Sequence, residues 1–425
     1  MSAPKQPSQT PTLDLSRWRN VPNLMMGIGG AGALLGLIVN PTQFAHSWLL
    51  GFMFCLSLVM GALFLVIVHH LFDAGWSVPI RRFCEHIANL VFPWMVAFFV
   101  PIALFAPKLY SWMDIKDRAG HPALEAKYPL FTMGGFYLVS ALCFAVWWWL
   151  AKGLRDASLE QDRTGAAECT HRMRRYAGGG IVLFAFTLTL AVILWMKGMM
   201  YEWFSTMYGV YYFAGSVWMT LGTVYLITMV LKRNGTLAAV LHEHQFYFIG
   251  SLMFAFTVFY AYIHFSQYFI IWNANVPEET FWYVLREQGT WWYVGMIIIF
   301  GHFFLPFLAL LRIDLKLTFW WMTPICVWTW LMHYFDLSFN IMPTLHPDGF
   351  PLFWIWLDLA CLALMVGLLT RAFLANFARH APFPVKDPRL CEAMGLIAPC
   401  ASPISGGEMD ETDELADALP QTGAK

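Results

Sequence analysis

Ten long apolar runs fill the sequence, and they restrict the chain to a helical membrane fold. Runs of about 20 apolar residues are long enough to cross the hydrocarbon of a bilayer as an α-helix. Only 12% of the residues are charged and the mean hydropathy is +0.55, whereas a soluble domain carries roughly 25% charged residues. We therefore predict an all-α polytopic membrane protein with about ten transmembrane helices. The predicted spans are 21–39, 47–72, 85–106, 131–150, 179–200, 210–231, 246–272, 290–311, 317–335 and 350–375.

The positions of the basic residues predict the orientation. Lys and Arg concentrate in the loops on the cytoplasmic side of a membrane. With ten spans, most of the 26 Lys and Arg residues fall on one side, together with both termini. We therefore expect cytoplasmic tails at 1–20 and 376–425 around a membrane domain at 21–375. The first tail lacks a cleavage signal, so the first span is expected to insert uncleaved. The second, Pro-rich and then acidic, is expected to be extended or docked on a partner.

A weak internal repeat suggests how the spans are grouped. The connection Gly75–Glu85 and the apolar run after it resemble the connection Gly235–Gln245 and its following run. This predicts two parallel four-helix bundles, spans two to five (about 47–200) and six to nine (about 210–335), flanked by the first and tenth spans. A chance match is the alternative.

The sequence carries no motif for a tightly bound redox centre. Its eight cysteines are scattered singly, without CxxC, and no Gly-rich phosphate loop or Walker sequence occurs. These absences argue against covalent haem, an iron–sulfur cluster, a metal site and ATP-driven work by this chain. Any redox centres that it uses would have to lie in other subunits. Lipids are its expected surroundings, and nucleic acid is not an expected partner.

The first group of ionisable residues lies where the second span ends and the third begins. His69 and His70 stand one helical turn before Asp73, and two arginines stand one turn before Glu85, so each set shares a helix face. One interpretation is a helix end that is anchored by charge, which suits the arginines best. The other is a proton-uptake relay of His69, His70, Asp73 and Glu85, because a histidine beside a carboxylate exchanges protons near neutral pH.

The second group is a polar stripe in the seventh span. Tyr260, His264 and Gln267 are spaced by four and three residues and share one face. An interhelical hydrogen bond is the simpler explanation, and contact with a quinone headgroup or a water chain is the alternative. His264 with His302 is the only pair that could hold a di-histidine haem, and the second pair of the usual arrangement is missing.

The third group lies in the last three spans. His302 is near the centre of the eighth span, where Pro306 removes a backbone hydrogen bond and predicts a kink. His333 and Asp336 are three residues apart at the end of the ninth span, toward the outer side of the membrane. Asp358, expected in the middle of the tenth span, is a costly isolated acid whose partner the sequence does not identify.

Four segments carry a family resemblance: HHLFDAGWSVPIRR, YIHFSQYFIIWNANVPEE, GHFFLPFLALLRIDLK and HYFDLSFNIMP. They resemble the NrfD/polysulfide-reductase-type membrane subunits, and in particular the ActF type of bacterial alternative complex III, a quinol:cytochrome c or other electron acceptor oxidoreductase. The resemblance extends from about Leu15 to Arg371. It implies ten helices in two four-helix bundles in the bacterial inner (cytoplasmic) membrane. The implied partners are a homologous NrfD-like subunit that oxidises quinol, an iron–sulfur subunit and haem c subunits.

The resemblance also implies roles for the ionisable residues. It implies a cytoplasmic proton half-channel at His69, His70, Asp73 and Glu85, and an outer half-channel at His264, His302, His333 and Asp336. We therefore expect a subunit of a respiratory quinol-oxidising complex without a catalytic centre or redox centre of its own. Menaquinone or ubiquinone would touch it at Tyr260, His264 and Gln267. A proton-coupled transporter and a purely structural scaffold are the alternative functions.

Overall fold

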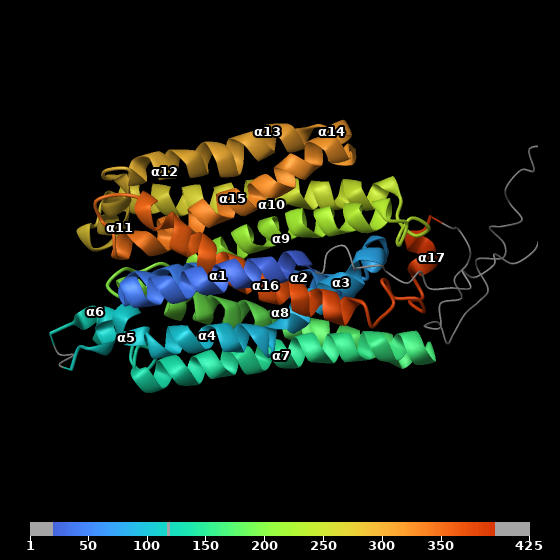
Figure 1. Cartoon of the computed structure of the whole chain (residues 1–425), viewed down its shortest axis with the longest axis horizontal. Coiled ribbons are helices and arrows are strands. Elements are labelled where there is room, and N and C mark those ends of the chain that lie inside the picture. Colours follow the sequence, from blue (N-terminus) through green and yellow to red (C-terminus); the bar gives the residue numbers. More distant parts are fainter. Residues whose placement is uncertain (1–19, 117–119, 396–425) are drawn as a thin grey trace, which may run out of the picture.

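The computed structural model describes residues 20–116 and 120–395, and all regular elements in these ranges are helical. The long helices lie roughly parallel (Figure 1). We call the end that carries α6 and α11 the α11 end, and the opposite end, with α14 and α17, the α17 end. The helices that make up the spans are α1 (Asn20–Val39), α2 (Pro41–Leu71), α3 (Val78–Ala88), α4 (Trp94–Leu104), α7 (Met133–Thr164), α8 (Ala167–Trp195), α9 (Tyr208–Arg233), α10 (Glu243–Ala274), α12 (Trp291–Ile298), α13 (Leu305–Leu311), α15 (Phe319–Ile341) and α16 (Ile355–Phe377). The helices of the connections and the C-terminal segment are α5 (Ala106–Leu109), α6 (Pro122–Glu125), α11 (Pro277–Glu287), α14 (Ile313–Leu317) and α17 (Leu390–Ala393).

Within the described residues, nine helical stretches are long and apolar enough to cross a membrane. They coincide with the first eight predicted spans and the tenth, which identifies a multi-pass membrane protein. The predicted span 317–335 falls on α15, which is not among the nine because Trp, His and Asp residues make it less apolar. Its 23 residues nevertheless extend about 35 Å, which matches the thickness of the hydrocarbon.

The helices α2 and α9 form the centre of the molecule. In their most apolar stretches 72% and 78% of the residues are buried, compared with 22% in α1. They pack against each other, while α2 also contacts α4 and α8 and α9 also contacts α10 and α15. Figure 1 shows α4, α7 and α8 on one side and α10, α12, α13 and α15 on the other. Polar residues on α2 and α9 are therefore enclosed by protein.

The peripheral helix α1 is attached to α16 through a stripe of small residues. A Cβ atom on Gly29 would lie only 2.4 Å from the backbone nitrogen of Leu364, and one on Gly32 would lie 2.6 Å from the Cβ of Ala360. Glycine lets the two backbones approach closely, and such packing associates helices in lipid, where burial of apolar surface adds little.

A branched side chain at Gly29 is expected to separate α1 from α16. The substitution Gly29→Ile forces a shift of backbone rather than of a side chain. We therefore expect the free energy of unfolding to fall by about 1–3 kcal/mol, the usual range for overpacking. Gly27→Ile is the matched control on the same helix, because a Cβ there meets nothing within 4 Å. Thermal unfolding of the two detergent-purified variants measures the difference, and equal melting temperatures would refute the proposed close contact.

The described part of the C-terminal tail packs onto the membrane domain. Residues 378–395 cross the α17 end, where α17 contacts α3 and the turn before it. The expectation of a tail that is extended or docked on a partner is therefore wrong for these residues. Their charged side chains pair with buried arginine and with Asp73, which the apolar pattern of the sequence does not reveal. The remainder of the tail, 396–425, lies outside the described residues.

Candidate functional site

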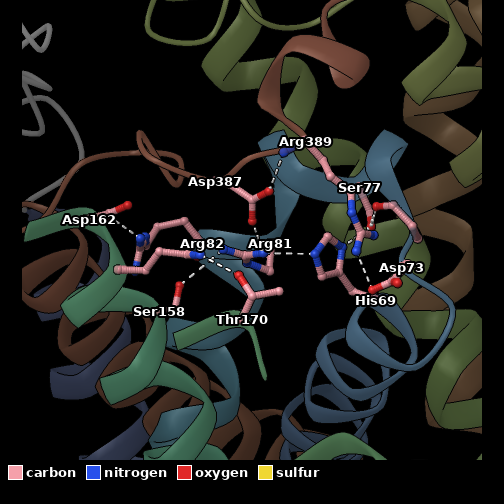
Figure 2. Close-up of polar contacts among 12 residues, drawn as sticks. His69, Asp73, Ser77, Arg81, Arg82, Ser158, Asp162, Thr170, Asp387 and Arg389 are labelled. Carbon is pink, nitrogen blue, oxygen red and sulfur yellow. Dashed lines mark hydrogen bonds and ion pairs between the residues drawn. The ribbon is translucent and has the colours of Figure 1, made fainter. Parts of the chain in front are cut away.

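A cluster of charged residues closes the α17 end. It joins α2, α3, α7, α8 and the C-terminal segment (Figure 2). We call it the α17-end cluster, and it pairs four arginines with four carboxylates. Its members are His69, His70, Asp73, Ser77, Arg81, Arg82, Glu85, Ser158, Asp162, Arg174, Asp387 and Arg389.

Glu85 lies at the centre of this cluster between two guanidinium groups. Arg81 Nε is 3.0 Å from its Oε1 and Arg82 Nη1 is 3.1 Å from its Oε2, and all three side chains are fully enclosed. The other face of Arg82 pairs with Asp162 on α7, and Arg81 Nη1 donates to Asp387 at 2.5 Å. Both predicted i,i+3 and i,i+4 relationships are thus present as ion pairs. The arginines are enclosed by protein, not extended into solvent as anchors.

His69 is held in one protonation state by its neighbours. Arg81 Nη1 donates to its Nε2 at 2.9 Å, and an arginine has no lone pair to accept with. The imidazole proton is therefore on Nδ1, which donates to Ser77 Oγ at 2.6 Å, while Ser77 donates to the carbonyl of Ala74. His69 can take up a second proton only after its bond to Arg81 breaks. This gives Arg81 control over any proton transfer through His69.

The two remaining residues of the first predicted group lie beside His69. His70 is buried with its ring centroid 4.7 Å from that of His69, and its Nε2 lacks a hydrogen-bond partner among the described residues. Asp73 is half exposed at the mouth of the cluster, where it forms two hydrogen bonds with Arg174, at 2.6 and 2.9 Å, and an ion pair with Arg389. The structure therefore places all four predicted residues in one cluster. The predicted pairing of Asp73 with the two histidines on one helix face is wrong, because α2 ends at Leu71 and Asp73 pairs with arginines instead.

Acidification is expected to release the C-terminal segment. Burial by itself raises the pKa of Asp387, but Arg81, the backbone N–H of Arg389 and His70 outweigh it and hold this pKa below its usual value. A carboxyl whose pKa is lower in the folded chain stabilises the fold above its unfolded pKa of about 3.9, and loses that contribution as the pH falls through the folded pKa. We therefore expect the segment to stay docked down to about pH 4 in the wild type.

The substitution Asp387→Asn is expected to release the same segment at neutral pH, because the neutral amide no longer pairs with Arg81. Hydrogen exchange of peptides from 378–395, compared between variant and wild type at one pH, measures the release. Asp348→Asn, on the exposed loop before α16, is the control for the same chemical change. Unchanged exchange in the Asp387 variant would show that Asp387 does not hold the segment.

A second cluster is buried between α9, α10 and α15 near the α11 end, and we call it the Asp336 cluster. Asp336 Oδ1 accepts hydrogen bonds from the hydroxyls of Tyr211 and, at 2.8 Å, of Tyr260. The two hydroxyls are 3.0 Å apart. Asp336 is 2% exposed, and no Lys or Arg among the described residues forms an ion pair with it. A buried carboxylate without a cation needs such donors, since its desolvation is otherwise very costly.

His333 extends the Asp336 cluster toward α2. A Cβ on Gly215 would lie 3.4 Å from the His333 ring and 3.7 Å from Asp336 Oδ2, so both side chains converge on this glycine. His333 Nε2 shares a 2.8 Å hydrogen bond with Ser57 Oγ, and Ser216 Oγ lies 3.0 Å from the same oxygen. His333 Nδ1 has no hydrogen-bond partner among the described residues, so His333 and Asp336 are neighbours that no direct hydrogen bond joins.

His302 lies where the α-helix of the eighth span is interrupted, one turn before Pro306. The interruption is a π-helical segment, η6 (Ile299–Phe304), between α12 and α13. The imidazole is stacked between the rings of Trp218 and Tyr260, with centroids 3.9 and 3.6 Å away. It is fully buried, and neither ring nitrogen has a hydrogen-bond partner among the described residues. Single π-helical turns are frequent at functional sites.

His264 and Gln267 lie on the α11-end side of the Asp336 cluster. They line a small cavity together with Tyr211, Tyr283 and other side chains, but Tyr260 does not line it. Its volume of about 10 Å³ is close to the minimum for a single water molecule. A quinone ring would therefore require movement of these side chains before it could reach the predicted contacts.

Several residues of both clusters were not predicted from the sequence. Tyr208 donates to Asn340 at 2.9 Å, and Asn340 donates to Tyr211 at 3.2 Å and to the carbonyl of Asp336. Asn340 had a usable signal, because it stands one helical turn after Asp336 in an apolar run. Asp387 had none, because its partner Arg81 is 306 residues away in the chain.

Comparisons with known protein families and curated proteins found no match to this chain. A scan against models of protein families found none that matches the chain, and a search of curated proteins found no match either.

Proposed function

We propose that this chain is an integral membrane subunit of a respiratory quinol-oxidising complex of the alternative complex III type, and that it conducts protons. In this proposal it has ten transmembrane helices in two four-helix bundles with two flanking helices, and both termini are cytoplasmic. It lies in the bacterial inner membrane beside a homologous NrfD-like subunit, an iron–sulfur subunit and haem c subunits. Menaquinone or ubiquinone is the substrate of the complex, and this chain has no redox centre.

The Asp336 cluster carries the proton-conducting part of the proposal. It contains a buried carboxyl that has no ion pair with a Lys or Arg of the described residues, two tyrosines on that carboxyl and a histidine hydrogen-bonded to a serine. Each of these groups can pass a proton to a neighbour, and ionisable groups are rarely kept inside a membrane without such a role. The α17-end cluster lies at the opposite end of the bundle, which suits a second half-channel. The four segments that resemble NrfD-type subunits support the assignment to a quinol-oxidising complex.

Gentle purification of the tagged chain from its own membrane tests the proposal. We expect subunits with haem c and iron–sulfur clusters to co-purify and the preparation to oxidise quinol. A chain that purifies alone and transports a solute would instead be a proton-coupled transporter. Substitution of His264 in the assembled complex, followed by proton uptake and electron transfer in liposomes, then tests the proton-conducting role.

The scaffold alternative is favoured by one specific observation. Every carboxylate of the α17-end cluster has an arginine partner, as in networks that only hold helices together. On this alternative, substitution of Asp73 would lower the yield of assembled complex but leave the turnover of the surviving complex unchanged. A lower turnover in fully assembled complex would support the relay.

A further inference from the structure

Asp358 is a buried acid that belongs to neither cluster. It lies in the first turn of α16, not in the middle of the helix as the sequence suggested, and is 1% exposed. The partner that the sequence did not identify is Tyr334 on α15, whose hydroxyl donates to Oδ2 at 2.9 Å. No Lys, Arg or His among the described residues forms an ion pair with it. Tyr334 and Asp336 are on different sides of α15, so this carboxyl is separate from the Asp336 cluster.

A row of side chains leads from Asp358 to the α11 end. Gly51 on α2 packs against Cys361 on α16, so Ser47 and Asp358, each one helical turn earlier, face each other, and Oδ1 of this carboxyl has no hydrogen-bond partner among the described residues. Gln43 Nε2, one turn earlier on α2, donates to Ser47 Oγ at 3.3 Å. The other end of the same amide, Oε1, is 2.6 Å from Nε2 of His346, which lies half-buried in the loop between α15 and α16. Gln43 and Ser47 are fully buried, so His346 is the link between this row and water.

The donors of this row all point toward Asp358. Gln43 Oε1 has no proton, so Nε2 of His346 must donate to it. The amide nitrogen of Gln43 donates to Ser47 Oγ, which leaves the Ser47 proton free for the carboxylate. Two consecutive hydrogen bonds thus lead from His346 to the Ser47 hydroxyl, which faces the unpartnered Oδ1 of Asp358. This polarity is expected when Asp358 is ionised and must reverse when it carries a proton.

Few other titratable groups face Asp358. Within the described residues, the α1 segment Asn20–Val39 that packs on α16 has none, α15 contributes Tyr334, and α16 itself contributes Cys361. On α2, His46 uses its Nδ1 for the carbonyl of Thr42 at 2.9 Å. Burial lowers the pKa of His346, so this residue is a neutral acceptor at neutral pH that protonates only transiently. We therefore expect proton exchange between Asp358 and water to run through this row of side chains.

We propose that His346, Gln43, Ser47 and Asp358 form a proton pathway from the aqueous surface at the α11 end to a buried acceptor, distinct from the Asp336 cluster. This pathway rests on the proposed function only in that the pathway and the proposed function both concern proton conduction. A proton from water binds Nδ1 of His346, whose Nε2 proton moves to Gln43 Oε1. Gln43 then gives an amide proton to Ser47, and Ser47 gives its hydroxyl proton to Asp358. Each relay group receives one proton and gives one, and Gln43 returns from the imidic acid to the amide when the transfers reverse.

Infrared difference spectroscopy of the full chain in oriented proteoliposomes tests this pathway. A pH jump is applied on one side, and the carboxylic acid band that Asp358→Asn removes is followed in time. We expect the band to respond to the pH on the α11 side, and Gln43→Leu to slow the response by about tenfold or more, as loss of one hydrogen-bonded link implies. Ser47→Ala tests the adjacent link with a smaller change if Gln43→Leu fails to fold.

Gln245→Leu is the matched control, because Gln245 is an equally buried glutamine that donates to the carbonyl of Ala393 at the α17 end. It is expected to leave the rate unchanged. An unaltered rate in both Gln43→Leu and Ser47→Ala, or a band that follows the pH on the α17 side, would overturn the pathway. The measurement needs neither quinol nor partner subunits. A chain that purifies without redox partners would therefore contradict the proposed function and leave this test intact.

Discussion

The substitution Glu85→Ala is expected to lower the stability of the protein by about 3–5 kcal/mol, the usual effect of breaking a buried ion pair by removing one partner. The loss arises because Arg81 and Arg82 would both remain enclosed without the carboxylate that lies between them. Asp387 and Asp162 still contact the outer sides of the two guanidiniums, but they do not reach the space between them. Thermal unfolding of the detergent-purified variant, with the yield of folded protein, measures the effect.

The control for this prediction is Glu168→Ala. Glu168 pairs with Arg175 at 3.0 Å, the same distance as the buried pair, but both side chains are about two-thirds exposed or more. Water screens such a pair and replaces it when it is broken, so little change is expected. If Glu85→Ala were no more destabilising than Glu168→Ala, the α17-end cluster would not be the structural centre that its burial indicates.

The substitution Asp336→Asn is expected to reduce proton uptake by the assembled complex in liposomes by about 100-fold or more, the range found when a positioned proton-transfer group is removed. Asparagine has nearly the same shape and still accepts hydrogen bonds from Tyr211 and Tyr260, but it has no exchangeable acid proton. The fold should therefore survive while proton transfer fails.

Two comparisons make this prediction decisive. Asp314→Asn, at an exposed ion pair with Arg312 in α14, should leave proton uptake unchanged. Tyr260→Phe, which removes one of the two donors to Asp336, should give an intermediate loss. Proton uptake at the wild-type rate in fully assembled Asp336→Asn complex would exclude a conducting role for this carboxyl and favour the scaffold.

Helical spacing located two predicted site residues well, whereas an uncertain helix boundary misplaced a third. His264 and Gln267 were placed on one face of a helix by spacing alone, and the structure finds both beside the same small cavity. Asp358 was expected to be in mid-helix, but α16 begins at Ile355, so the acid lies in the first turn and reaches Tyr334 and α2. Helix boundaries depend on caps and turns, which the apolar pattern locates only within a few residues.

The sequence by itself determined the class of fold, the positions of nine spans and the presence of acids and histidines inside them. Hydropathy is a property of each short segment, and a bilayer tests every segment separately, so this information is local and readable. Helical spacing likewise identified Arg81, Arg82 and Glu85 as neighbours, because residues on one turn have fixed relative positions.

Only the tertiary structure decided which of these groups meet. Arg81 with Asp387, Tyr211 with Asp336, and Gln43 with His346 join residues far apart in the chain. Such contacts depend on how helices rotate and pack against one another, and many rotations satisfy the same apolar pattern. The choice among them is made by the need to satisfy every buried polar group where no water can do so, and that condition involves the whole molecule at once.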